Sequence, residues 1–390
     1  MRTYERTHPW LKFSVNLSQA PPDLWVMLGE CQSKCEHISN TPILPQVQAD
    51  LLQIYLAKGS LATAAIEGNT LSEEEVIQHL EGKLRLPPSK KYLGVEIDNI
   101  VNACNTVLDF IRAGRQAPPL IAKEIETINK LMSANLEMDD EVVPGEIRTH
   151  SVGVPGYRGA PAEDCEYLLE RLCQWLAGPV FDPPENMGVV YAIIKAILAH
   201  LYLAWIHPFG DGNGRTARLV ELRILMSSGV PHPAAHLLSN HYNQTRSEYY
   251  RQLRRASASG GDVLPFMRYA VQGFLDGLRG QLMMIHDQQW LVVWRDLVWG
   301  KFGGKGTHAQ IRRRRLVFAL SRQAAPVPIS ELPELDPKLM LAYAGKTRKA
   351  IARDVNALID LGLVSKDKSG VRVRTEALLG FQAVKTLDNL

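Results

Sequence analysis

The sequence predicts a mainly α-helical protein, in which a helical bundle with one small β-hairpin precedes a small basic module of helices and a second hairpin. Apolar residues recur at helical spacing over most of the first 285 residues. Short runs with β character occur in a Gly-rich stretch at 142–160 and near the C-terminus. The chain has 390 residues, more than one typical domain, so two or three domains are expected.

The composition is that of an ordinary globular protein, with 46% hydrophobic and 22% charged residues. The first ten residues, MRTYERTHPW, contain no apolar core or cleavage pattern, so they do not suggest secretion. The five cysteines are scattered and odd in number, which favours a reducing cytoplasm over a disulfide framework. Cys31, Cys35 and His37 lack a second pair of ligands, so a zinc site is disfavoured.

The expected domain order follows from changes of pattern along the chain. It comprises an N-terminal segment (1–45), a helical domain (46–285), a linker (286–307), the basic module (308–376) and a tail (377–390). Apolar spacing and helix-ending Gly or Pro predict helices over 23–35, 45–58, 92–112, 119–135, 162–177, 187–206, 215–228 and 240–256. A further helix begins after Ser72, which forms a capping-box pair with Glu75.

The segment from Met187 to Ile206 is long and apolar, and its length would suffice to span a membrane. However, Lys195 and His200 lie inside it, and the Pro-rich sequence FDPPE precedes it. We therefore favour a buried core helix that is hydrophobic nearly all round.

The run His207–Arg218, HPFGDGNGRTAR, connects this helix to the next one and has the composition of an anion site. The first turn of a helix has unpaired backbone N–H groups and carries partial positive charge. Gly212 and Gly214 allow a ligand to approach the backbone closely. Arg215 and Arg218 lie one helical turn apart, so both side chains can face one phosphate chain.

Two other residues of this run carry chemistry. Asp211 offers a hard oxygen ligand for a magnesium ion that bridges phosphates. His207 is the one group of the run that can take up a proton near neutral pH. An ordinary structural turn built from Gly-Asn-Gly and His-Pro is the alternative. The coincidence of these features favours a nucleotide site with a general base.

The same run resembles the signature of the Fic family, H-P-F-x-[D/E]-G-N-G-R-x-x-R, and matches it at every specified position. Fic proteins usually transfer AMP from ATP to a hydroxyl side chain of a target protein. The resemblance implies that His207 is the general base and that Asp211 holds Mg²⁺. The implied nucleotide-binding residues are Gly212, Asn213, Gly214, Arg215, Thr216, Ala217 and Arg218. Among them, Arg215 would neutralise the leaving pyrophosphate and Arg218 the γ-phosphate of ATP.

An upstream stretch, TAAIEG, resembles the inhibitory motif of the same family, [S/T]-x-x-x-E-[G/N]. Thr63, Glu67 and Gly68 occupy its specified positions, in an expected inhibitory helix at about 58–68. From residue chemistry alone, Glu67 would be a solvated glutamate near a helix end. The resemblance instead implies that Glu67 pairs with Arg218 and so blocks the position of the γ-phosphate.

The Gly-rich stretch 142–160 predicts two short strands beside turns, with a plain surface loop as the alternative. It resembles the Fic flap, a hairpin with P-G-x-x-R near its start that pairs with the backbone of the target protein by strand addition. Gly145 and Arg148 match this pattern, and the resemblance implies that they bind the target.

Tyr249 and Tyr250 occur together in the predicted helix 240–256. Such a pair more often forms part of a core with one solvated edge. Fic proteins have a similar Tyr-Tyr run that lines the nucleotide, so the resemblance implies this role for both residues.

From Lys301 to Arg374 the chain is strongly basic, with sixteen Lys or Arg and six Asp or Glu, whereas the whole chain carries a net charge of only +3. Helices are expected over 308–323, 329–335 and 346–361, and strands over 363–366 and 371–374. This order resembles a winged helix-turn-helix. Its candidate recognition helix carries Lys346, Arg348, Lys349 and Arg353. Such modules bind DNA or dock proteins, and both partners stay open.

Three functional hypotheses follow from the sequence. The first is autoinhibited transfer of AMP from ATP to a protein hydroxyl. The second uses the same site in reverse, with Glu67 positioning a water molecule that removes AMP from a modified side chain. The third is a DNA-binding regulator that senses nucleotide through an inactive Fic fold, which the complete catalytic run disfavours. The family resemblance also implies a homodimer.

Overall fold

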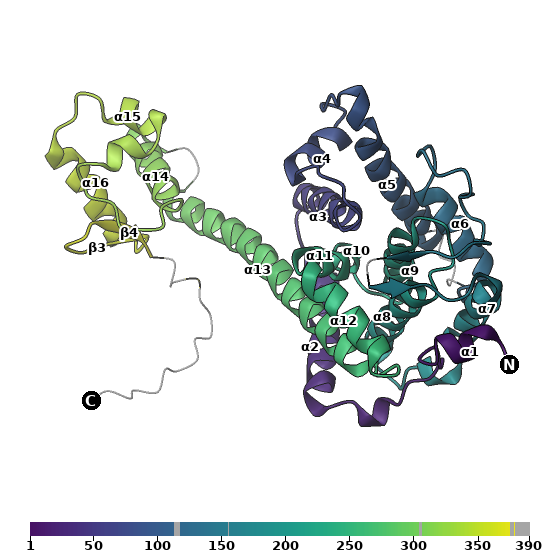
Figure 1. The fold of residues 1–390 in the computed structure, drawn as a ribbon. Helices are drawn as coiled ribbons and strands as arrows, with labels where there is room; N and C mark the ends of the chain where they lie inside the picture. Colours follow the sequence, from purple (N-terminus) through teal and green to yellow (C-terminus); the bar gives the residue numbers. More distant parts are fainter. Residues whose placement is uncertain (113–117, 155, 304–305, 375–377, 379–390) are drawn as a thin grey trace. The chain divides into compact units, whose positions relative to one another are not determined.

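The computed structural model describes residues 1–112, 118–154, 156–303, 306–374 and 378 (Figure 1). The chain divides into two compact units, Met1–Met283 and Met284–Leu390, and the helix α13 (Leu264–Phe302) contains the division. In the described part, both units are helical and each has one two-stranded antiparallel hairpin. The expected mainly α fold class is confirmed.

The first unit is a bundle around α8 (Gly188–Ile206) and α9 (Asn213–Ser227). The helices that surround this pair are α2 (Pro22–Asn40), α3 (Pro45–Ala65), α5 (Lys91–Arg112), α6 (Ala122–Met132) and α7 (Cys165–Leu176). Both α2 and α7 pack against α8, whereas α3, α5 and α6 pack against α9. The shorter helices are α1 (Thr3–Thr7), α4 (Glu73–Leu80), α10 (His232–Ala235), α11 (Leu237–Gln244) and α12 (Arg246–Ala258). The run that resembles a catalytic signature therefore joins the two central helices.

The helix α8 is buried in the core, as its composition predicts. Most of its side chains are buried, including those of His200 and Trp205. It is long and apolar enough to cross a membrane, but 78% of its most apolar window is buried inside the unit. Contacts with α2, α7 and α9 cover this apolar surface with protein.

The N-terminal segment belongs to the first unit, so the predicted boundary between the segment and the helical domain is wrong. The helix α2 buries Leu24, Leu28, Cys31 and Cys35 in the common core. These residues are spaced by three or four positions and so lie on one face of the helix. The prolines of this segment mark the ends of helices rather than the edge of a domain.

The segment that resembles an inhibitory motif is the end of α3 rather than a helix of its own. The helix predicted over 45–58 continues to Ala65, and Gly68 then turns the chain with a φ of +110°. Glycine adopts this conformation without steric cost. The helix α4 follows with the predicted capping box, in which Ser72 and Glu75 exchange hydrogen bonds.

The single helix predicted over 240–256 is two helices, α11 and α12, separated by Thr245. The hydroxyl of Thr245 donates to the carbonyl of His241 at 2.7 Å and lies 2.6 Å from the hydroxyl of Tyr269. A threonine hydroxyl that bonds to the carbonyl four residues back slightly destabilises a helix and often bends it, and Thr245 makes this bond at the junction of α11 and α12.

The second unit contains the end of α13, α14 (His308–Leu320), α15 (Pro337–Tyr343), α16 (Arg348–Asp360), and the hairpin of β3 (Val364–Lys366) and β4 (Val371–Val373). The strands pair Val364 with Val373 and Lys366 with Val371. A bridge between Val327 and Val371 adds a third short segment to the hairpin. The helices α14 and α16 and the hairpin occur in the predicted order.

The predicted linker over 286–307 is wrong for most of its length, because α13 continues to Phe302. Trp294, Val298 and Phe302 are buried in the core of the second unit. These apolar side chains make the segment part of that unit, since their burial there removes them from water.

The helix α15 was not predicted, and the expected helix over 329–335 is a short 3₁₀ turn at Leu332–Leu335. The sequence contains a signal for α15, since Asp336 accepts a hydrogen bond from the backbone N–H of Lys338, as an N-cap residue does. The predicted tail over 377–390 lies outside the described residues, apart from Leu378.

Candidate active site

The run His207–Arg218 forms the turn between α8 and α9, as predicted. His207 ends α8 in a left-handed conformation with a φ of +53°, and Gly212 precedes α9 with a φ of +74°. The helix α9 starts at Asn213, two residues earlier than expected, because the turn at Gly212 already directs the chain into the helix. The unpaired N–H groups of the first turn therefore belong to the Gly-Asn-Gly part of the run.

His207 has a ring nitrogen available to accept a proton. Its Nδ1 lies 3.3 Å from the carbonyl oxygen of Ala204. A carbonyl only accepts, so Nδ1 carries the hydrogen and Nε2 is the basic nitrogen. Burial lowers the pKa of His207, and the charge of Arg148 acts in the same direction. Together they outweigh the hydrogen bond to the Ala204 carbonyl and the charges of Glu67 and Asp211, which raise this pKa. The imidazole is therefore neutral at pH 7.

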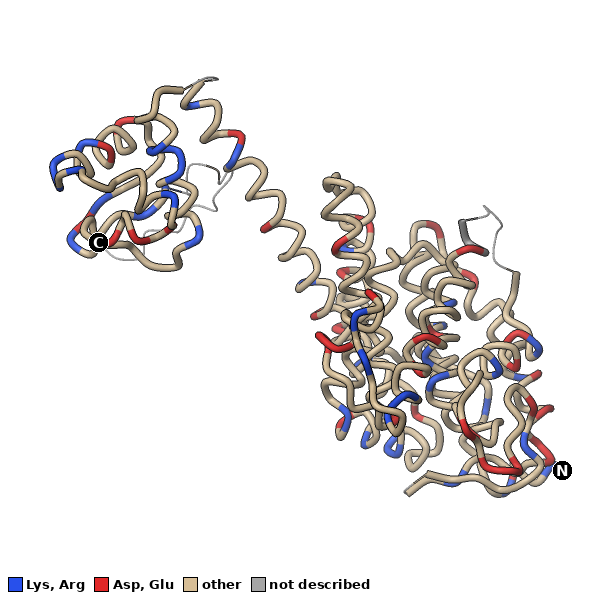
Figure 2. The backbone as a smooth tube through the Cα atoms, turned by 90° about the horizontal axis from the view of Figure 1, so that it is seen from above, with Lys and Arg blue, Asp and Glu red and all other residues tan. Residues whose placement is uncertain are grey.

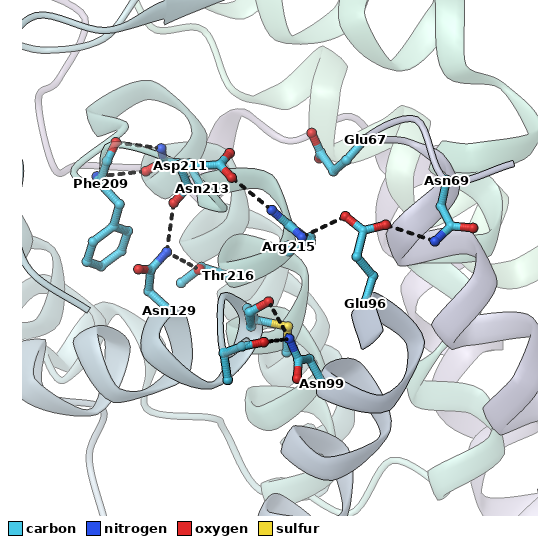
Figure 3. A network of polar contacts seen from close by, with 12 residues as sticks. Glu67, Asn69, Glu96, Asn99, Asn129, Phe209, Asp211, Asn213, Arg215 and Thr216 are labelled. Carbon is cyan, nitrogen blue, oxygen red and sulfur yellow. Dashed lines mark hydrogen bonds and ion pairs between the residues drawn. The ribbon is translucent and has the colours of Figure 1, made fainter. Parts of the chain in front are cut away.

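Asn213 holds the shape of the turn with its side chain. Its Oδ1 accepts from the backbone N–H of Phe209 at 2.9 Å, and its Nδ2 donates to the carbonyl of Phe209 at 2.8 Å (Figure 3). The residue is only 5% exposed. Because both polar atoms of the Asn213 side chain bond within the turn, its backbone N–H group is the part that could contact a nucleotide.

Two of the residues predicted to bind nucleotide have side chains in the protein interior. Ala217 is buried in the core, and Thr216 is 1% exposed. The hydroxyl of Thr216 accepts a hydrogen bond from Asn129. On a helix, these two positions are rotated away from the face that carries Arg215 and Arg218, so the binding of nucleotide by Thr216 and Ala217 stays a prediction.

Asn129, on α6, was not identified from the sequence, although it connects three parts of the site. Its Nδ2 donates to the carbonyl of Asp211 at 2.9 Å and to the hydroxyl of Thr216 at 3.1 Å (Figure 3). Its Oδ1 accepts from the backbone N–H of Gly145 at 2.9 Å. A single asparagine on an amphipathic helix gives no local signal of such a role.

Arg215 is held by two carboxylates (Figure 3). Its Nη1 donates to Oε1 of Glu96 at 2.9 Å and its Nη2 to Oδ2 of Asp211 at 3.1 Å. Glu96, on α5, also accepts from Nδ2 of Asn69 at 2.8 Å. Asn69 lies two residues after Glu67, so the segment after α3 reaches Arg215 through Glu96. Glu96 was also missed in the sequence, because it lies in an ordinary helix far from the catalytic run.

Arg218 forms the ion pair with Glu67 that the family resemblance implies. Its Nη2 donates to Oε1 of Glu67 at 2.5 Å and to the carbonyl of Thr63 at 2.9 Å, and Arg218 is only 1% exposed. Burial raises the pKa of Glu67, but the charge and hydrogen bond of Arg218 outweigh it, so the net pKa is lowered. Glu67 is therefore ionised at neutral pH. Thr63 contributes its carbonyl to this contact.

A cavity opens beside His207 and Gly214. Its lining residues are Glu67, Val154, Tyr157, Ala204, Trp205, His207, Gly214, Tyr249, Tyr250, Leu253 and Arg254. Glu67 reaches the start of α9 here, because a Cβ atom at Gly214 would lie 2.1 Å from its Oε1. The side chain of Glu67 thus occupies space next to the N–H groups that would bind an anion.

Tyr249 and Tyr250 both line this cavity, and their contact with nucleotide stays a prediction. Tyr249 is 3% exposed, and its hydroxyl lies 2.8 Å from Nε2 of His200 in the core. The hydroxyl of Tyr250 donates to the carbonyl of Ile66 at 3.5 Å, next to Glu67. The pair therefore combines a buried and a partly exposed ring, as the composition of the helix suggests.

The predicted flap contains a hairpin of β1 (Gly153–Val154) and β2 (Tyr157–Arg158). Arg148 precedes it and is 5% exposed. Its guanidinium donates to the backbone carbonyls of His207 at 2.8 Å, His150 at 2.6 Å and Ala160 at 2.5 Å. These hydrogen bonds attach the flap to the catalytic turn, and the binding of a target by Arg148 stays a prediction.

Gly145 also has a structural reason to be glycine. Its φ is +82°, and a Cβ atom would lie 2.8 Å from Cβ of Lys130. Its backbone N–H is the donor to Asn129. Gly145 thus allows the chain to pass closely over α6, and its contact with the target stays a prediction.

The residues present fit a magnesium ion that is held together with phosphates. In the described part of the chain, no group of three or more His, Cys, Asp or Glu could hold a metal ion. The side chain of Asp211 is 53% exposed, and its Oδ2 is the oxygen that bonds to Arg215. Magnesium is commonly bound by one or two carboxylates plus substrate phosphates, and Asp211 provides one carboxylate beside an anion-binding turn.

Comparison with known proteins finds one domain family and related enzymes. Residues 119–225 match the model of the Fic/DOC family. Protein adenylyltransferase fic-1 of Caenorhabditis briggsae is 30% identical over 251 residues, which are 62% of this chain and 44% of the relative. Protein adenylyltransferase Fic of Drosophila melanogaster is 30% identical over 210 residues, which are 53% of this chain and 38% of the relative. The matches thus span less than half the length of these relatives.

Solved structures have the same fold. A Fic family protein from Desulfovibrio desulfuricans has a TM-score of 0.54 at 20% identity, covering 90% of this chain and 92% of that one. A fragment of Fic-1 from C. elegans has a TM-score of 0.50 at 26% identity, covering 67% of this chain and 72% of that one.

Proposed function

From the Fic domain that this chain contains at residues 119–225, we propose that the protein transfers AMP from ATP to a hydroxyl side chain of a target protein and is inhibited by its own Glu67. The observation that carries this proposal is the position of a neutral His207 beside the first turn of α9 and two buried arginines. A base, an anion-binding helix end and two cations are what nucleotidyl transfer to a hydroxyl requires.

The reaction follows from these groups. The hydroxyl oxygen of the target attacks the α-phosphorus of ATP, while Nε2 of His207 takes the hydroxyl proton. The bond from the α-phosphorus to the bridging oxygen of the β-phosphate breaks, and pyrophosphate leaves with that electron pair. A bound Mg²⁺, held by Asp211, would supply charge neutralisation of the phosphates.

The turn stabilises the charge that develops on the phosphates. The backbone N–H groups at Gly212, Asn213 and Gly214 lie at the positive end of α9. Arg215 and Arg218 each have a buried Nε with no hydrogen-bond partner among the described residues, so both retain donor capacity. We assign Arg215 to the leaving pyrophosphate and Arg218 to the γ-phosphate.

The ion pair of Glu67 and Arg218 supports autoinhibition. It occupies the guanidinium that the γ-phosphate requires, and it places a negative charge near Gly214. The same position of Glu67 favours a second activity, in which its carboxylate positions a water molecule to remove AMP from a modified side chain. Incubation of AMP-labelled target with the wild type and with Glu67→Gly would separate the two, because removal requires Glu67 and transfer does not.

The test of the proposed function uses ATP labelled at the α-phosphate, mixed with cell lysate and the wild-type, Glu67→Gly or Glu67→Gly/His207→Ala chain. We expect labelled protein bands with Glu67→Gly, weaker bands with the wild type and none with the double variant. An absence of label with all three chains would contradict the proposal.

The pH dependence of transfer by Glu67→Gly is expected to have its acid limb below about pH 6.5, the ordinary pKa of histidine. Because the pKa of His207 is lowered, the base stays unprotonated as the pH falls to that value, and the rate is lost only below it. Initial rates at saturating ATP from pH 5 to 9 would measure this. An acid limb centred above pH 7 would contradict the assignment of a neutral, buried His207 as the base.

We propose in addition that the second unit binds double-stranded DNA. Figure 2 shows several Lys and Arg residues along this unit. Arg312 and Arg313 pair with the buried Asp354, at 2.7 and 2.8 Å, and so support the fold. By contrast, the cations at and near the start of α16 are exposed: Lys346, Arg348, Lys349 and Arg353. An exposed basic helix before a hairpin supports insertion into a DNA groove.

Replacement of Arg348, Lys349 and Arg353 by Gln is expected to weaken DNA binding at least tenfold. The slope of log K against log salt concentration should fall by about one unit for each phosphate that the variant no longer neutralises. Fluorescence anisotropy with a labelled duplex at several salt concentrations would measure both. A matched control replaces three exposed cations of the first unit, Arg85, Lys90 and Lys91. Equal weakening in both variants, or no DNA binding by the wild type, would favour a protein-docking module instead.

Two further proposals concern the cellular setting. We propose a cytoplasmic location, which is supported by five free, buried cysteines. Dimerisation, which the family resemblance implies, also stays a proposal.

A further inference from the structure

The chain before α2 passes along the flap and is anchored at its beginning. We call residues 2–13 the N-terminal strap. Asp164, which is 2% exposed, accepts from the backbone N–H of Tyr4 at 2.7 Å and from Nη1 of Arg2 at 3.3 Å. The guanidinium of Arg2 lies 3.8 Å from the centroid of the Tyr167 ring. These contacts fix the start of the strap on the residues that follow the flap.

The middle of the strap contacts β2 directly. His8 is 6% exposed, and its Nε2 lies 3.0 Å from the backbone carbonyl of Arg158. Because a carbonyl only accepts, Nε2 of His8 carries the hydrogen and donates it to the flap. His8 therefore supplies a buried hydrogen bond to a strand that consists of two residues.

An aromatic cluster continues this contact toward the active site. The ring of His8 lies 4.9 Å from that of Trp10, and both rings lie 6.3 Å from that of Tyr157 in β2. The hydroxyl of Tyr157 donates to the carbonyl of Trp205 at 2.7 Å, two residues before His207. Tyr157 also lines the cavity beside His207. The strap thus packs against the residue that joins the flap to the end of α8.

The flap cannot hold this position by its own hydrogen bonds. Each strand has two residues, and an isolated two-stranded hairpin is marginally stable at best in water. Arg148 supports its ends, since it bonds to the carbonyls of His150 and Ala160. The strap supplies the contact to β2 between those ends, whereas β1 is exposed, with Val154 at 43%. The strap therefore holds β2 in place, whereas β1 is exposed and can pair with a strand of another protein.

We propose that the N-terminal strap is a positioning element for the flap, in which His8 and Trp10 hold β2 so that the open strand β1 is ordered for strand addition by the target protein. The expected effect on target affinity rests on the proposed function. Because the strap already holds β2 in place, less conformational entropy is lost when β1 becomes ordered on binding the target. The strap therefore raises the affinity for the target and leaves the ATP site unchanged.

The experiment uses the full chain with Glu67→Gly and adds His8→Ala, His8→Gln, or Arg2→Ala. His8→Gln keeps an N–H donor for the carbonyl of Arg158. Arg2→Ala removes the half-exposed side chain that pairs with Asp164, and it is used in place of His8→Ala if that variant does not fold. His37→Ala, an exposed histidine on α2, is the matched control. Hydrogen–deuterium exchange of the amides in 152–160 reports the order of the flap without any assumption about catalysis.

We expect flap amides to exchange about tenfold faster in His8→Ala, with other core amides unchanged, and near-normal rates in His8→Gln and His37→Ala. Lysate protein at graded concentration and α-labelled ATP serve as probes of transfer. Compared with the parent Glu67→Gly chain, His8→Ala should require several-fold more lysate protein for half-maximal labelling. The ATP concentration that gives half-maximal labelling should be the same for both chains. Unchanged flap exchange, faster exchange throughout the unit, or an equal change for ATP would overturn the proposal. If no variant transfers label, the proposed function fails, while the exchange data still decide whether the strap orders the flap.

Discussion

Replacement of Glu67 by Gly is expected to raise AMP transfer about tenfold to a hundredfold over the wild type. The charge-assisted hydrogen bond between Glu67 and Arg218 must break before the γ-phosphate can use this guanidinium, and such bonds contribute about 1.5–3 kcal/mol. Glycine removes the carboxylate from the space beside Gly214 as well. Initial rates of label transfer to lysate protein at fixed ATP would measure the gain.

The matched control is Glu137→Gly, which removes an exposed glutamate outside the helices of the first unit. It should transfer AMP at the wild-type rate. Equal rates for Glu67→Gly and the wild type, in the presence of measurable transfer, would show that the ion pair does not restrain the enzyme. The pair would then be a structural contact between the turn after α3 and α9.

Replacement of His207 by Ala in the Glu67→Gly chain is expected to lower transfer by about 10²–10⁴-fold, the usual contribution of a general base. ATP affinity should stay within a few-fold, because Arg215, Arg218 and the first turn of α9 remain in place. Rapid-mixing assays would measure the rate, and calorimetric titration with ATP would measure the affinity.

His286→Ala, which removes an exposed histidine on α13, is the control for this variant and should leave the rate unchanged. A melting temperature close to that of the parent would show that His207→Ala keeps the fold. Transfer at the parental rate would remove His207 from the role of base. A parallel loss of ATP affinity would instead show that the variant disrupts the turn.

The sequence by itself determined the local chemistry of the catalytic turn. Within a few residues of a helix start, positions have fixed geometry, so the spacing of Arg215 and Arg218 already places both side chains on one face. Glycine at 212 and the helix end at His207 are equally local features. The predicted buried helix α8 followed from composition for the same reason, since no partner element was needed to recognise it.

The tertiary structure alone decided which distant residues complete the site. Asn129 and Glu96 contact the turn from helices 82 to 119 positions away in the chain, and neither has a sequence signal of its own. Arg148 matches a flap motif in the sequence, but only the structure shows that its guanidinium donates to the backbone carbonyls of His207 and Ala160. Even the partner of Arg218, 151 residues upstream, was expected from family resemblance and not from spacing. Such contacts depend on how whole helices pack, and packing is a property of the complete core rather than of any short run of residues.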